Sequence, residues 1–275
     1  MRVSARNQPT FCGPRRRAYR ASAGLCAVLL LASSPALSDP PSAVTVPAET
    51  LDDTYPLDTV ERQVPGRGSF RCPTVPLVRY PGSALRYHSA VRVNPYFRER
   101  LGRFEQVVAD VAREIYGRAP RRIRHIGTYN CRRIGGWPTL ISEHGLGNGI
   151  DIAGFQFARA ARAESLPAGL PAVLRRPFHV SVLRHWRSTD PAGAVHARFL
   201  HTLARRLIAR RDIFRVLLGP GYPGHDNHFH FDVAPWRLID MDLGPDQGAA
   251  SIAPAAVVPG LDAAAEGNKL GLQRR

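Results

Sequence analysis

The sequence predicts an α+β fold in which a small antiparallel sheet is flanked by helices. Two stretches carry apolar residues at three- and four-residue spacing, which is typical of helices that bury one face. Four other runs are short and have strand character. Glycine and proline number 24 each, so we expect many loops between these elements.

The first predicted helix begins after Asn94, a residue type that caps helices, with Pro95 in the first helical position. It ends at Gly117, and its apolar residues are Phe97, Leu101, Phe104, Val108, Val111 and Ile115. The second predicted helix covers residues 194–211, and its buried face contains Val195, Phe199, Leu203 and Leu207. We interpret His196 and His201, which lie on different faces of this helix, as surface residues.

The four runs of strand character are residues 125–131, 148–157, 214–218 and 228–234. Together with the helices they define a predicted domain over residues 67–245. Residues 39–66 are rich in proline, aspartate and threonine without periodicity, and are predicted to be a flexible linker. Residues 246–275 are biased towards alanine, proline and glycine, and are predicted to be a disordered tail.

Residues 1–38 have the composition of a secretory signal peptide. Arginines at positions 15, 16, 17 and 20 precede a short apolar stretch, and Ala36 and Ser38 suit cleavage before Asp39. The apolar stretch is far shorter than the ~20 residues of a membrane-spanning helix, so we predict no stable membrane insertion after cleavage. An uncleaved N-terminal anchor is the alternative. The paired arginines also fit the twin-arginine route. We therefore expect a periplasmic or secreted protein.

Cys72 and Cys131 are the cysteines that remain once Cys12 and Cys26 leave with the signal peptide. In an oxidising compartment a lone pair of cysteines typically forms a structural disulfide. Such a bridge would close a loop of roughly 60 residues and contribute about 4 kcal/mol through the unfolded state. Two buried free thiols are the alternative.

The predicted domain is strongly basic. Residues 67–245 contain 28 arginines against 13 acidic residues, a net charge of +15. In an exported protein this charge suits peptidoglycan or another anionic wall polymer. Nucleic acid is not expected as a partner, because the protein is predicted to leave the cell interior and contains no recognised nucleic-acid-binding motif. The alternative is that these arginines are solvated surface residues without a common partner.

Two segments contain residue types that bind metal ions. Residues 142–151 read SEHGLGNGID, and residues 225–232 read HDNHFHFD. Alternation along a strand places His228 and His230 on one face, with the phenylalanines on the other. In the first segment a glycine-rich turn presents His144, and flanking isoleucines turn Asp151 away from the core. Because zinc prefers imidazole nitrogen and carboxylate oxygen, the two segments together predict one zinc site.

These segments resemble known families. S-x-H-x-x-G-x-G-x-D is similar to the S-x-H-x-x-G-x-A-x-D signature of lysostaphin-type enzymes, D-Ala-D-Ala peptidases and the hedgehog domain, with Gly149 replacing alanine. HDNHFHFD is similar to the H-x-x-H-x-H ending of penicillin-insensitive murein endopeptidases. Over residues 67–236, Cys72-Pro73, YNCR, the two metal-binding segments and VLLGPGY resemble the bacterial extensin-like C-terminal domain family. This resemblance implies a hedgehog- or D-Ala-D-Ala-peptidase-like zinc domain.

Transferred by position, the resemblance implies that His144, Asp151 and His230 hold one zinc ion. It implies that His228 lies beside the zinc-bound water, as a base or as a stabiliser of the tetrahedral intermediate. His225 falls where relatives have a histidine or a catalytic carboxylate, and is the second catalytic candidate.

Arg132 lies upstream of the zinc ligands, where the D-Ala-D-Ala peptidases have an arginine that binds a substrate carboxylate. A solvated arginine is the alternative. Ser142 would hold the turn or contact substrate. Asn227 replaces the glutamate that many of those peptidases have three residues before the last ligand. Two functions therefore stay open, a zinc peptidase acting on peptidoglycan peptides and a non-catalytic, zinc-stabilised wall-binding module.

Overall fold

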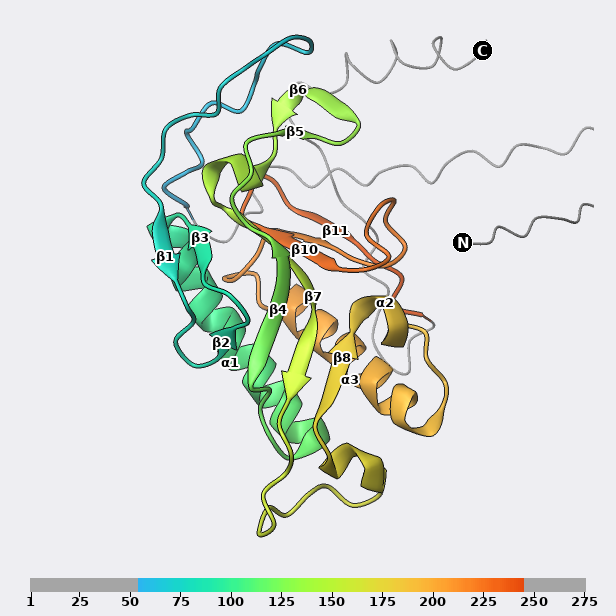
Figure 1. The fold of residues 1–275 in the computed structure, drawn as a ribbon. Coiled ribbons are helices and arrows are strands. Elements are labelled where there is room, and N and C mark those ends of the chain that lie inside the picture. Colours follow the sequence, from blue (N-terminus) through green and yellow to red (C-terminus); the bar gives the residue numbers. More distant parts are fainter. Residues whose placement is uncertain (1–53, 245–275) are drawn as a thin grey trace, which may run out of the picture. The chain divides into compact units, whose positions relative to one another are not determined.

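Residues 54–244 are described by the structure, a computed structural model, and form a mixed α+β fold (Figure 1). The predicted signal peptide, the first part of the predicted linker and the predicted tail lie outside these residues. The helices are α1 (Pro95–Tyr116), α2 (Val182–His185) and α3 (Pro191–Ala209), with 3-10 turns η2 (Glu143–Leu146) and η3 (Ala172–Arg175). The strands are β1 (Val78–Tyr80), β2 (Arg86–Tyr87), β3 (Val91–Val93), β4 (Arg122–Gly127), β5 (Arg133–Ile134), β6 (Trp137–Ile141), β7 (Gly149–Phe157), β8 (Phe178–Ser181), β9 (Val216–Leu218), β10 (Phe229–Asp232) and β11 (Leu238–Asp240).

Both long helices were predicted, and capping explains their ends. The Asn94 side chain accepts a hydrogen bond from the backbone of the first turn of α1, and Gly117 ends the helix in the left-handed conformation at φ 74°. Helix α3 begins earlier than predicted, because Asp190 caps it and proline follows at the first position. The interpretation of His196 as a surface residue is wrong, since it is 5% exposed and hydrogen-bonds Tyr116.

Strand β7 organises the main sheet, whose order is β11-β9-β10-β7-β4-β2. Along one edge β7 pairs with β4, and along the other it pairs first with β10 and then with β8. All of these pairings are antiparallel, as predicted. The outer pairs β9–β11 and β2–β4 are parallel, which corrects the expectation of a purely antiparallel sheet. After β9 the chain forms β10 on one side of that strand and then returns to form β11 on its other side.

Helices α1 and α3 pack on one face of this sheet and lie behind it in Figure 1. The ring of Phe155 on β7 lies 5.2 Å from that of Phe199 on α3. Phe231 on β10 lies 5.8 Å from Phe104 on α1. Because successive strand residues point to opposite faces, the polar neighbours of Phe231 lie on the face away from these helices. None of the helices within residues 54–244 is long and apolar enough to span a bilayer.

The described part of the predicted linker, residues 54–66, packs against the domain and is not a free linker. Tyr55 and Leu57 are each 5% exposed, and the Tyr55 hydroxyl donates a hydrogen bond of 2.7 Å to the side chain of Asn148. Gln63 forms a β-bridge with Leu140. Single side chains anchor this segment, and it forms no regular helix or strand. Its sequence therefore shows no periodicity and resembles that of a linker.

Candidate metal centre

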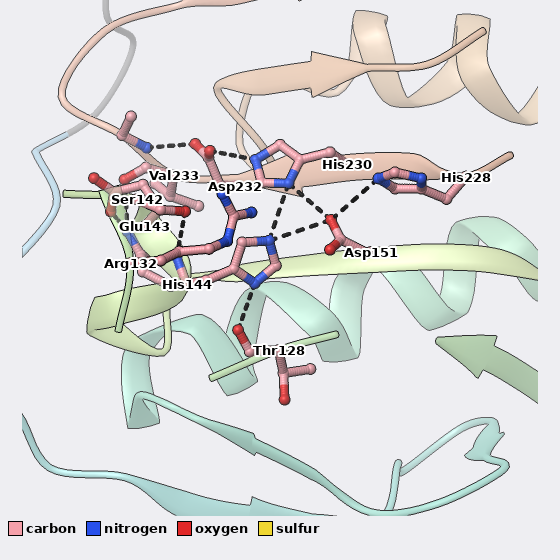
Figure 2. A network of polar contacts seen from close by, with 12 residues as sticks. Thr128, Arg132, Ser142, Glu143, His144, Asp151, His228, His230, Asp232 and Val233 are labelled. Atoms are coloured by element: carbon pink, nitrogen blue, oxygen red, sulfur yellow. Dashed lines mark hydrogen bonds and ion pairs between the residues drawn. The ribbon is translucent and has the colours of Figure 1, made fainter. Parts of the chain in front are cut away.

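His144, Asp151 and His230 converge on one point, from η2, β7 and β10 respectively (Figure 2). His230 and Asp151 are directly opposed in the β7–β10 pairing, which places both side chains on the same face of the sheet. His144 arrives from the turn that precedes β7. Among the described residues, these three form the one group of histidine, cysteine and acidic side chains whose atoms could share a metal ion.

The spacing of the three donor atoms suits a tetrahedral ion. His144 Nε2 lies 3.2 Å from Asp151 Oδ1 and 3.1 Å from His230 Nδ1. His230 Nδ1 lies 2.9 Å from Asp151 Oδ1. Tetrahedral zinc with bonds of about 2.0–2.1 Å separates its ligands by about 3.3 Å. The donors therefore need to move apart by only a few tenths of an ångström to hold such an ion.

The outer hydrogen bonds of the two histidines fix which ring nitrogen carries the proton. His144 Nδ1 faces the backbone carbonyl of Thr128, which can only accept, so Nδ1 is the donor. His230 Nε2 donates to the Asp232 carboxylate over 2.7 Å. In the neutral rings this leaves His144 Nε2 and His230 Nδ1 with lone pairs that point towards Asp151. Two lone pairs and one carboxylate at a single point suit a cation, and the donor set therefore fits a metal ion.

The electrostatics of the cluster express the same requirement. Burial opposes ionisation of Asp151, but close contacts with the imidazoles of His144 and His230 in their protonated forms outweigh it and hold the pKa of this carboxyl far below its usual range. Burial also opposes protonation of His230, but the two carboxylates on either side raise its pKa to about 10. Without a metal ion, a proton on His230 would take the place of the missing positive charge.

The turn that presents His144 is fixed by a cap, a disulfide and glycines. Ser142, which is 4% exposed, accepts a hydrogen bond from the His144 backbone N–H over 3.4 Å. This hydrogen bond gives Ser142 the first of its two predicted roles, holding the turn. The predicted Cys72–Cys131 disulfide is present. A Cβ at Gly145 would lie 2.6 Å from the Cys72 sulfur, so only glycine allows the turn to pack on the disulfide.

Glu143, next to the ligand in sequence, points into the core. Its carboxylate accepts hydrogen bonds from Arg62 at 2.6 and 3.3 Å and from Asn148 at 2.6 Å. Both partners of the Arg62–Glu143 pair are almost fully buried. Burial raises the pKa of Glu143 against the opposing charge of Arg62. This pair therefore anchors the turn to the N-terminal segment of the domain and does not face the metal centre.

His228 lies beside the three donors but outside their set. Its Nε2 is 3.7 Å from Asp151 Oδ1, and its Nδ1 is 2.6 Å from the side-chain oxygen of Asn227. That contact makes Nδ1 the donor and leaves a lone pair on Nε2. The His225 ring lies 4.8 Å from that of His228, so both catalytic candidates reach the same side of the centre. Burial lowers the pKa of both imidazoles, that of His228 to about 4.

Arg132 is exposed. The pKa of His225 is lowered mainly by burial of its ring, and the charge of Arg132 is close enough to lower it further. The structure thus places Arg132 at the rim of the centre, near the cluster in Figure 2. Sequence reasoning missed Thr128 and Asp232, the groups that orient the two histidines. Asp232 could have been predicted, because the same strand alternation that places His228 and His230 on one face also places Asp232 there. Thr128 acts through its backbone and leaves no signal in the sequence.

The fold and the site define a mixed α+β protein with a His–Asp–His cluster, largely buried, that could hold a metal ion. Residues 51–169 match the family described as extensin-like protein C-terminus, which supports the extensin-like family for this chain. The match includes both cysteines, His144 and Asp151, and ends before the second histidine segment. Searches among curated proteins and among solved structures give no match.

Proposed function

We propose that this protein is an exported, zinc-dependent peptidase that acts on peptidoglycan peptides. The observation that supports this most strongly is the convergence of two imidazole lone pairs and one carboxylate, with His228 beside them. Three protein ligands of this type are characteristic of zinc sites that keep a fourth position for water. The resemblance of the two segments to zinc peptidases points to the same chemistry.

The chain's own residues would divide the work as follows. His144, Asp151 and His230 would hold the zinc ion, whose chemistry when bound is to polarise the substrate carbonyl and to lower the pKa of a bound water to ~7. His228 Nε2, whose lone pair is fixed by the contact of its other nitrogen with Asn227, would accept the proton of the attacking water. His225, whose ring lies 4.8 Å from that of His228, would be the alternative acceptor of this proton.

Arg132 would bind the substrate. Its guanidinium is exposed at the rim of the centre and makes one long hydrogen bond, of 3.4 Å, to a neighbouring carbonyl. A planar guanidinium matches a carboxylate in two parallel hydrogen bonds. Peptidoglycan stems carry free carboxylates, so the arginine would select and orient such a stem. The basic domain would support the encounter with an anionic wall polymer.

A non-catalytic, zinc-stabilised wall-binding module is the second candidate. It is favoured by Asn227, which occupies the position of the missing glutamate and hydrogen-bonds His228. In that case the metal ion would stabilise the fold and the peptide would be bound without being cut.

The test is to purify the full chain, measure bound metal by mass spectrometry and incubate the protein with defined muropeptides. We expect about one equivalent of zinc and new cleavage products. His144→Ala should lose both metal and cleavage, whereas His228→Ala should keep the metal and lose about 100-fold or more in rate. One equivalent of zinc without cleavage products would support the binding module. A metal-free protein whose stability is unchanged by a chelator would remove both candidates.

A further inference from the structure

A cavity of about 560 Å³ lies at the far end of β7 from the metal centre. Asp151 is near the start of this strand, and the cavity is lined by Gln156 and Phe157 at its end. Five residues of extended strand separate the two sites by about 16 Å. The cavity is therefore a separate site, and the zinc proposal does not explain it. Its volume is in the range of small-molecule sites.

One wall of the cavity is a row of polar side chains that crosses three strands. In the β4–β7 pairing Arg122 opposes Gln156, and in the β7–β8 pairing Gln156 opposes His179. Directly opposed residues share a face, so these three side chains stand next to one another on the sheet. Each of them lines the cavity. The row thus presents hydrogen-bond donors to the same space.

The cavity is positively charged. Arg121, Arg122 and Arg159 line it, and no acidic residue is among its lining residues. None of these arginines has an ion-pair partner among the described residues, in contrast to the buried Arg62–Glu143 pair. Burial and then the charge of Arg124 lower the pKa of His179, which agrees with an excess of positive charge here. Such an arrangement attracts an anion.

An apolar part of the lining points to a ligand with an organic body. Pro177 and Phe178 form an apolar part of the lining. Phe178 is held rigidly, because its ring stacks on Phe157 with a centroid distance of 4.6 Å and an interplanar angle of 15°. A preformed apolar surface beside cationic groups suits a small organic acid.

We propose that this cavity binds an oxyanion group, a carboxylate or a phosphate, carried on a small organic body. Arg122 and Arg159 would hold the oxyanion, Gln156 and His179 would add hydrogen bonds, and Pro177 and Phe178 would contact the body. This site does not rest on the proposed peptidase function, since it uses none of the same residues.

The experiment titrates the full, folded protein with benzoate, phenyl phosphate and benzamide and follows backbone amide shifts by NMR. Benzamide matches benzoate in shape and lacks its charge. We expect benzoate or phenyl phosphate to shift the amides of residues 156–159, 178 and 179, and benzamide to bind about ten-fold more weakly. The comparison of benzoate with phenyl phosphate distinguishes a carboxylate ligand from a phosphate ligand.

Arg122→Gln and Arg159→Gln should each weaken binding of the tighter anion by about five-fold or more. Arg98→Gln is the matched control, because it removes one exposed arginine near the start of α1 and the cavity does not include it. The proposal is overturned if Arg98→Gln weakens binding as much as the cavity variants, because the attraction would then be diffuse. It is also overturned if the anions shift other amides, or if benzamide binds as tightly as benzoate.

Discussion

Replacing Arg62 with methionine tests whether the N-terminal segment supports the turn that presents His144. The substitution removes two hydrogen bonds to Glu143 and two more to the backbone carbonyls of Leu57 and Val60. It leaves the Glu143 carboxylate buried with one remaining donor, Asn148. Removing one partner of a buried ion pair costs about 3–5 kcal/mol, so we expect a loss of this size in the free energy of unfolding.

The pH dependence of this loss follows from Glu143. Burial raises the pKa of its carboxyl, and without Arg62 nothing of comparable strength opposes the effect. A carboxyl with a raised folded-state pKa binds its proton more readily in the folded state, so stability is lost as the pH rises. The free energy of unfolding of Arg62→Met should therefore fall further below that of the parent protein at pH 8 than at pH 5.

The assay is urea unfolding followed by circular dichroism at both pH values. Arg62→Met/Glu143→Gln should recover about half or more of the loss, because no buried charge remains and Asn148 keeps its acceptor. Arg113→Met is the control, since its pair with Asp110 is more than half exposed and should contribute less than about 1 kcal/mol. A surface ion pair contributes up to ~1 kcal/mol. If the free energy of unfolding of Arg62→Met at pH 8 is within ~1 kcal/mol of the parent value, the buried pair does not support the turn.

Three other perturbations are predicted. Asp232→Asn should weaken zinc binding by about 10–100-fold in a chelator competition, because it loses the carboxylate that orients His230; unchanged affinity would contradict this role. Burial lowers the pKa of His196 to about 4, so the free energy of unfolding should fall by about 3 kcal/mol as the pH drops from 6.5 to 4. Thermal melts of His196→Phe should show a smaller loss of stability over the same pH range. Replacing Cys72 and Cys131 by serine should cost about 4 kcal/mol in chemical unfolding, since the bridge spans 59 residues; a loss below 1 kcal/mol would mean that it constrains little.

The sequence by itself determined the elements whose signals are local. Helix α1 matches its prediction because its cap, its proline, its apolar spacing and its terminal glycine all lie within the helix or next to it. The segments around His144 and His230 were identified for the same reason, since residue type and strand alternation are local properties. The disulfide followed from composition, because the predicted mature chain offers only one pair of cysteines.

Tertiary structure alone decided which groups surround these elements. Tyr55 and Arg62 belong to the domain because partners more than 80 positions away bury them, and no local pattern encodes such a partner. The burial of His196 likewise depends on the ring of Phe178 and on Tyr116, contributed by other elements. The cationic cavity exists because strand pairing aligns Arg122 and His179, which no sequence spacing brings together. The sequence predicted the three candidate metal ligands that the structure brings together, whereas the contacts that fix their protons and charge depend on long-range packing.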